Sequence, residues 1–98
     1  MSSRVGVIVS ITVKAGRGSD QIALFDEIAP LVRAEEGCLA YDLHAVVGDR
    51  DRFKILEWWA SAEALADHGK TSHMVEAAAR ASSFRAGPAE ITLIEPAL

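Results

Sequence analysis

The chain has 98 residues, which is the usual length of one domain and too short for two independent cores. Half of the residues are hydrophobic and 24% are charged, a balance that excludes an intrinsically disordered chain. The net charge is −4 and the ten Lys and Arg residues are scattered along the chain, which argues against nucleic acid as a partner. We therefore expect residues 1–98 to form a single small acidic domain.

The only cysteine, Cys38, excludes an internal disulfide and favours a reducing compartment, so we expect a cytoplasmic location. No apolar run approaches the ~20 residues that are needed to span a bilayer. The first residues lead into an alternating pattern and not into the continuous apolar stretch of a signal peptide. A membrane partner is therefore not expected.

Residues 5–13 carry the clearest strand pattern in the chain. Every second position is a branched aliphatic residue: Val5, Val7, Val9, Ile11 and Val13. The intervening positions carry no charge before Lys14, which indicates that both faces of this strand are covered.

A helix is predicted from about residue 19 to residue 35. Ser19 is a favourable N-cap, and Gly37 is expected to end the helix as the residue after its C-cap. The stripe expected to face the core consists of Ile22, Phe25, Ala29 and Val32.

Two strands, two helices and a final strand are predicted in the rest of the chain. Strands over residues 38–47 and 52–60 form a hairpin around a polar turn at residues 48–51. Ser61 caps a short helix that ends at Gly69, and Thr71-Ser72 caps a third helix that reaches about Phe84. The apolar side of this third helix is expected to include Met74, Val75, Ala78 and Ala81, and residues 89–95 form the last strand.

The element order is strand, helix, strand, strand, helix, strand, with the second helix divided in two. This order predicts an α+β, ferredoxin-like fold, in which a four-stranded antiparallel sheet carries its helices on one face. The uncovered face is also apolar in part, through residues such as Ile8, Val46, Leu56, Trp58 and Ile94. Because soluble monomers rarely expose so large an apolar patch, we expect a homodimer in which two such sheets pack together.

No motif for phosphate, dinucleotide or zinc-protease chemistry occurs in the chain. Of the histidines His44, His68 and His73, the last two are five positions apart, about 140° around a helix, which is not a metal-ligand spacing. No metal site is therefore expected. Cys38 has no neighbouring base and is interpreted as a small buried hydrophobe and not as a nucleophile.

Glu57 is the carboxylate with the most unusual surroundings. It shares a strand face with Phe53, Ile55 and Trp59, so it must find a hydrogen-bond donor there or have its pKa raised. It could accept structural hydrogen bonds, or it could act as a base or an anchor in an apolar pocket. The pattern alone leaves both interpretations open.

Three segments of the chain resemble one known family. The segment Glu36-Gly37-Cys38-Leu39-Ala40-Tyr41-Asp42-Leu43 resembles the E-P-G-C-L-x-Y-x-L segment of the antibiotic biosynthesis monooxygenase family. The Phe53–Trp59 strand with Ser61-Ala62-Glu63-Ala64-Leu65 and His68 resembles its F-x-x-x-E-x-W-x-S-x-E-A-L-x-x-H segment. Thr71-Ser72-His73-Met74 resembles its T-x-H-F segment, with Ser72 in place of a common proline and Met74 in place of phenylalanine.

The resemblance implies a dimeric α+β barrel and a cofactor-free monooxygenase that oxidises a quinol-like or polycyclic phenol with O2. A deprotonated electron-rich phenol can itself pass an electron to O2, so no metal or organic cofactor is implied. By this resemblance His68 or His73 accepts the proton or binds the phenol, and Tyr41 and Trp59 are ring-stacking walls. Phe25 is expected to bind the substrate too, and Glu57 to orient it or to serve the structure.

The same resemblance leaves other functions to be weighed. Haem-degrading relatives need an asparagine on the first strand and a tryptophan and a histidine on the later helices. This chain has no asparagine, and His68 and Ala78 stand at the two helical positions, so haem degradation is disfavoured. The remaining alternative is a non-catalytic dimer of the same fold that binds a small molecule or serves in a stress response.

Overall fold

The computed structural model describes residues 4–98, and the element order is the one that the sequence predicts. The two halves of the second helical segment are separate helices, as expected. The elements are β1 (Val5–Thr12), α1 (Gly18–Arg33), β2 (Cys38–Val46), β3 (Asp49–Trp59), α2 (Ala62–Lys70), α3 (Ser72–Ala81) and β4 (Glu90–Ile94). None of the helices within residues 4–98 is long and apolar enough to cross a membrane.

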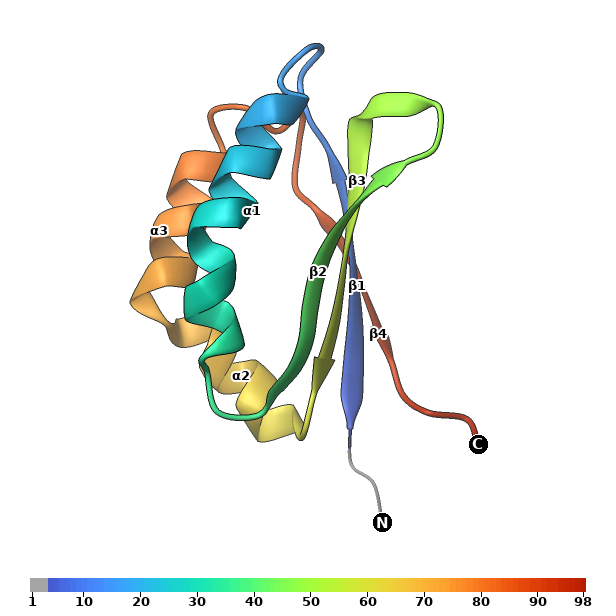
Figure 1. Cartoon of the computed structure of the whole chain (residues 1–98), viewed down its shortest axis with the longest axis vertical. Coiled ribbons are helices and arrows are strands. Elements are labelled where there is room, and N and C mark those ends of the chain that lie inside the picture. The colour runs from blue at the N-terminus through green and yellow to red at the C-terminus, as the bar shows by residue number, and fades with distance from the viewer. Residues whose placement is uncertain (1–3) are drawn as a thin grey trace.

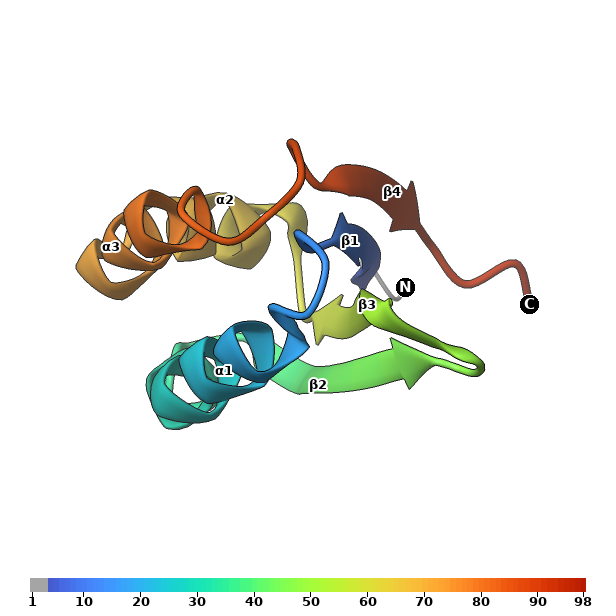
Figure 2. The ribbon, with the colours of Figure 1, turned by 90° about the horizontal axis from the view of Figure 1, so that it is seen from above.

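The four strands form one sheet in the order β2-β3-β1-β4, and each neighbouring pair is antiparallel. All three helices cover the same face of this sheet, and the other face is uncovered in a single chain (Figure 1). Seen from above, the helices and the sheet form two layers, with α1 over β2 and with α2 and α3 beside it (Figure 2). The predicted α+β, ferredoxin-like fold is confirmed.

The strand register decides which side chains face the helices. Glu57 on β3 pairs with Val7 on one side and with Tyr41 on the other, and Val7 in turn pairs with Leu93. These four residues therefore form one row across the sheet, on the face that the helices cover. These four residues line the cavity that is described in the next subsection.

Three of the four residues of the predicted α1 stripe, Phe25, Ala29 and Val32, are buried. The first member differs, because Gln21 is buried whereas Ile22 is 53% exposed, so the expectation that Ile22 faces the core was wrong. The buried residues of α1 keep the helical period and include one polar residue: Gln21, Leu24, Phe25, Ile28, Ala29 and Val32. On α3, Ala77 and Ala81 are buried, whereas Val75 and Ala78 are exposed, so the predictions for those two residues were wrong.

The starts of α2 and α3 agree with the sequence, whereas α3 ends at Ala81, before the predicted Phe84, and α1 differs at both ends. Ser61 accepts a hydrogen bond from the backbone N–H of Ala64, as expected for an N-cap. Ser19 does not cap α1, because the helix already begins at Gly18, one residue earlier. Gly37 does not end α1, which stops at Arg33; it takes a positive φ of 84° in the turn that enters β2.

The β2–β3 hairpin is tighter than the sequence suggests. Asp49 already belongs to β3 and pairs with Val46, so the connection consists of Val47 and Gly48 and not of residues 48–51. Gly48 has a φ of 81°, in the left-handed region that glycine adopts without a steric penalty. β3 is longer than predicted because the turn takes only two residues, so most of the polar residues assigned to the turn belong to the strand.

Two glycines give a matched test of packing against backbone strain. Gly37 and Gly48 have nearly the same positive φ, but a Cβ on Gly37 would lie 2.5 Å from the Cβ of Ala64, whereas a Cβ on Gly48 would meet nothing. We expect Gly48→Ala to lower the free energy of unfolding by about 1 kcal/mol and Gly37→Ala by about 2–4 kcal/mol. Urea unfolding of the two variants measures this difference, and equal losses would contradict the assigned packing.

Candidate active site

A cavity of about 410 Å³ lies between the sheet and the helices. Its volume falls within the roughly 300–1,000 Å³ range of small-molecule sites. Most of its wall is apolar, with aliphatic side chains that include Val7, Val9, Leu24, Ile28, Ile55, Leu65, Met74, Ile91 and Leu93. A few polar side chains interrupt this wall: Gln21, Tyr41, Glu57, His68 and Arg85.

Two aromatic rings form a flat part of the wall. The rings of Phe25 and Tyr41 are stacked, with centroids 4.9 Å apart and an angle of 17° between their planes. The ring of His68 stands edge-on to Tyr41 at 5.9 Å. Burial raises the pKa of the Tyr41 hydroxyl, and the nearby Glu57 raises it further, so Tyr41 is a neutral phenol at physiological pH.

His68 lies between two carboxylates. Its Nδ1 is 3.0 Å from Oε2 of Glu35, and its Nε2 is 3.9 Å from Oε1 of Glu57. A carboxylate on Nδ1 holds the proton there in the neutral ring, which leaves the lone pair on Nε2, beside Glu57 in the cavity wall. His68 is only 5% exposed, so this orientation is held in an interior with little water.

Glu35 joins His68 to a second histidine. The Nε2 atom of His73 is 2.7 Å from Oε2 of Glu35, the same oxygen that lies 3.0 Å from His68. The side chain of His73 is 18% exposed and that of His68 is 7% exposed. The row His73, Glu35, His68 and Glu57 therefore runs from the more accessible edge of the helices to the cavity wall.

Glu57 is a buried carboxyl group with one direct donor. It is 5% exposed, and its Oε1 accepts a hydrogen bond of 2.9 Å from the indole N–H of Trp59. Burial raises the pKa of Glu57, while the Trp59 hydrogen bond and His68 act in the opposite direction. Glu57 therefore accepts a structural hydrogen bond from Trp59 and also lines the cavity.

The raised pKa of Glu57 predicts how stability changes with pH. The folded chain keeps a proton on Glu57 at pH values above the ordinary 4.5, where the unfolded chain has lost it, so the free energy of unfolding falls as pH rises through the folded-state pKa. Glu57→Gln removes this dependence and keeps an oxygen for Trp59. We expect the free energy of unfolding of this variant, relative to that of the unmodified chain, to rise between pH 4.5 and pH 8.

Urea unfolding at several pH values measures this difference. Glu36→Gln is the matched control, because it removes the same charge at an exposed position in the turn after α1. A relative stability of Glu57→Gln that is flat with pH would contradict the assignment of Glu57 as a group with a raised pKa.

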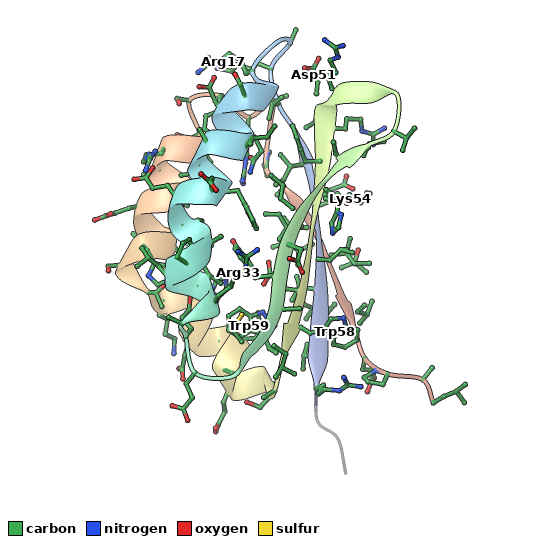
Figure 3. The ribbon with its side chains drawn as sticks, viewed as in Figure 1. Arg17, Arg33, Asp51, Lys54, Trp58 and Trp59 are labelled. Carbon is green, nitrogen blue, oxygen red and sulfur yellow. The ribbon has the colours of Figure 1, made fainter. Side chains whose placement is uncertain are left out.

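The structure separates the sequence-predicted site residues into two groups. Phe25, Tyr41, Glu57 and His68 line the cavity. Trp59 is fully buried and does not line it; its ring packs against His68 with centroids 4.5 Å apart, while Trp58 lies on the opposite face of the sheet (Figure 3).

His73 also does not line the cavity and reaches it only through Glu35. Cys38 is half-buried, and burial raises the pKa of its thiol above the ordinary value, which agrees with its interpretation as a small hydrophobe. Within residues 4–98, no group of three or more His, Cys, Asp or Glu side chains is arranged to hold a metal ion.

Three polar residues of the site were missed by the sequence analysis: Gln21, Glu35 and Arg85. Gln21 and Arg85 contact each other across 64 positions of sequence, and Glu35 contacts His68 across 33, so no local pattern pairs them. For Glu35 a signal exists, because the glutamate of the E-P-G-C-L segment stands two positions before the glycine, which is position 35 here.

A family model described as "Antibiotic biosynthesis monooxygenase" matches residues 4–80 of the chain. The chain belongs to this family. The match includes every residue of the His73–Glu35–His68–Glu57 row and stops before Arg85. The four residues His73, Glu35, His68 and Glu57 therefore lie within the region that the family model matches, whereas Arg85 lies after that region.

Relatives of known sequence and structure agree with this assignment. Rv0793 of Mycobacterium tuberculosis is 29% identical over 96 residues, which cover 98% of this chain and 94% of the relative. YcnE of Bacillus subtilis is 28% identical over 85 residues, which cover 87% and 90%. Both relatives are provisionally named as monooxygenases.

Solved structures show the same fold over nearly the whole chain. The structure of Rv0793 matches with a TM-score of 0.88 and covers 96% of this chain and 95% of its own. The structure of PA3566 from Pseudomonas aeruginosa matches at 26% identity with a TM-score of 0.91 and covers 100% and 98%. The chain therefore resembles these family members from end to end.

Proposed function

We propose that this chain is a cofactor-independent monooxygenase that oxidises a quinol-like or polycyclic phenolic substrate with O2. One observation carries the proposal: His68 lines an apolar cavity and is held between the carboxyl groups of Glu35 and Glu57. Membership in the monooxygenase family supports it. The cavity is lined by stacked rings that suit an aromatic ligand.

In the proposed reaction His68 is the general base. Its Nε2 takes the proton of the substrate hydroxyl, and the resulting imidazolium lies between the carboxyl groups of Glu35 and Glu57, with its Nδ1 only 3.0 Å from the Glu35 oxygen that stabilises its charge. The phenolate is formed in a cavity with few polar groups, so it is poorly solvated and readily gives an electron to O2. Tyr41 stays neutral and contributes its ring.

The electrons of the proposed reaction balance without a further reductant. One oxygen atom of O2 replaces a ring hydrogen of the quinol and the other leaves as water. The ring C–H bond supplies two of the four electrons, and the conversion of quinol to quinone supplies the other two. The product is a hydroxyquinone, so the chain's own residues need only bind the substrate, exclude water and move a proton.

The remaining site residues have supporting roles in this proposal. Phe25 and Tyr41 stack on the substrate ring, and Glu57 orients it and faces the protonated His68. Trp59 holds Glu57 through its N–H group and packs beneath His68. His73 passes the proton onward to solvent through Glu35.

Oxygen consumption tests the proposed function. A panel of hydroquinones, naphthohydroquinones and anthrones is incubated with the purified chain in a closed cell with an O2 electrode, with a chelator present and no flavin added. We expect O2 uptake with at least one of these substrates and a hydroxylated quinone as its product. Tight binding of a panel member without O2 uptake would support the binding module instead, and so would overturn the proposed enzyme.

We also propose that the active form is a homodimer in which the uncovered sheet faces pack together. This face carries Ile8, Leu56, Trp58 and Ile94. In the single chain the exposed fraction of Leu56 is 40% and that of Ile94 is 36%. Gly6 lies between Trp58 and Ile94, so no side chain of its own breaks the apolar surface. Sedimentation at micromolar concentration tests this, and a stable 10.5 kDa monomer would contradict it.

The proposed setting of the protein is one domain of residues 1–98 in the cytoplasm, with a small aromatic substrate, O2 and a second copy of the chain as partners. Burial keeps the thiol of Cys38 protonated, and a reducing compartment keeps it unpaired. Fractionation of cells that produce the tagged chain tests the location. Recovery of the chain outside the cytoplasmic fraction would contradict it.

A further inference from the structure

Arg85 gives the cavity a fixed positive charge. It follows α3, and its backbone is held by a hydrogen bond from its N–H to the carbonyl of Ala81 and by a bridge to Val13 at the end of β1. Its side chain is half-buried and lines the cavity. The Nε of Arg85 donates to the side-chain oxygen of Gln21, which is 1% exposed.

This guanidinium has no acidic partner among residues 4–98. Within residues 4–98, none of the ion pairs within 4.0 Å includes Arg85, and Glu57, the carboxyl group in the cavity wall, lies beyond that distance from it. Arg80, one turn earlier, pairs with Glu27 on the outer surface. Burial lowers the pKa of Arg85, because part of its hydration is lost and no carboxylate replaces it.

Arg85 and His68, the proposed base, are held by residues near opposite ends of α1. Gln21, which holds Arg85, lies in the first turns of α1, whereas Glu35, which holds His68, follows the last turn. These points are roughly 20 Å apart along the helix axis. Tyr41 lines the same cavity and stands edge-on to His68, with ring centroids 5.9 Å apart. The cavity therefore has a base toward one end and a cation toward the other.

We propose that Arg85, positioned by Gln21, binds an acid group of the substrate, so that the cavity takes a hydroxyaromatic monocarboxylate. This inference deepens the proposed function and rests on it, because it takes the cavity to be the substrate site. A guanidinium with its Nε already bonded still offers its two terminal nitrogens, which match the two oxygens of a carboxylate. Ala78 and Ala89 line the cavity together with Arg85, and their small side chains leave room for such a group.

The charge count favours a carboxylate over a phosphate. Arg85 is the only Lys or Arg among the described residues that line the cavity. One cation balances the single charge of a carboxylate, whereas a phosphate monoester would bring a second negative charge into an apolar wall. The aromatic walls formed by Phe25 and Tyr41 then hold the ring that carries the acid.

Binding of matched probes to the full chain tests the proposal. Isothermal titration calorimetry without O2 compares 6-hydroxy-2-naphthoate with 6-hydroxy-2-naphthamide, which has the same shape and no charge. We expect the unmodified chain to bind the acid roughly 10- to 100-fold more tightly than the amide. Arg85→Met should lose this preference and still bind the amide, and Arg80→Met, the control, should retain the preference.

The outcomes separate this inference from the proposed function. Equal binding of acid and amide by the unmodified chain would overturn it, even if Arg85→Met failed to fold. A preference for acid that survives in Arg85→Met would overturn it too, as would tighter binding of 2-naphthyl phosphate than of the naphthoate. Because no O2 is present, a failure of the enzyme proposal appears only in the uptake assay, and a failure of acid recognition appears only here.

Discussion

His68→Ala is expected to lower the rate of O2 uptake by roughly 100-fold or more, since general-base catalysis contributes about 10²–10⁴-fold. The variant removes the nitrogen that accepts the proton and leaves Glu35 and Glu57 without the imidazolium that they would stabilise. The measurement is the initial rate of O2 consumption with the best substrate of the hydroquinone panel. Raising the pH should partly restore the rate of the variant, because the substrate then loses its proton to solvent.

Two further variants distinguish a base from a residue that only fills space. His73→Ala should lower the rate far less than His68→Ala, because His73 is outside the cavity and acts through Glu35. Glu35→Gln should give an intermediate loss and shift the pH profile of the rate, because Glu35 sets the proton position on His68. Unchanged rates in both histidine variants would contradict the mechanism.

Trp59→Ala is expected to lower the free energy of unfolding by about 3–5 kcal/mol. Trp59 is fully buried, packs against His68 and donates to Glu57, so its loss leaves a large void and removes the donor of a buried carboxyl group. This is a large share of the roughly 5–15 kcal/mol by which domains of this kind are stable. Urea unfolding at low temperature measures the loss while the variant is still folded.

Trp58→Ala is the matched control for Trp59→Ala. Trp58 is the preceding residue and lies on the opposite, uncovered face of the sheet (Figure 3). If that face forms the proposed dimer, the effect of Trp58→Ala depends on protein concentration, because it weakens association. The effect of Trp59→Ala is expected to be much the same at all concentrations. A loss below 1 kcal/mol for Trp59→Ala would contradict its assigned role in the core.

Much of the fold could be read from short-range patterns. The alternation along residues 5–13 and the caps Ser61 and Thr71 depend on neighbours within a few positions, and the structure confirms them. The misplaced boundaries of α1 and of the hairpin come from Gly37 and Gly48. A glycine permits a positive φ, but the sequence does not say whether it serves a helix end, a strand entry or a two-residue turn.

Only some residues of the candidate site could be predicted from the sequence. Tyr41 and His68 came from the resemblance of single segments to one family, and Glu57 also came from its place on an apolar strand face. The roles of Glu35 and Arg85 depend on partners far away in sequence, although the family segment does contain a glutamate at position 35. Gln21 is buried in the structure, and its hydrogen-bond partner Arg85 lies 64 positions away in sequence.

By itself the sequence determined the order of the elements, the antiparallel α+β class and the family, because each follows from periodicity or from contiguous motifs. Only the tertiary structure decided that His68 stands between two carboxyl groups and that Trp59 is beneath the cavity wall and not in it. It also decided that Arg85 lines the cavity with no acidic partner in the described part of the chain. These are distances between segments that meet only after the sheet and helices pack. Burial and charge pairing depend on such distances, and those two properties control the chemistry of the site.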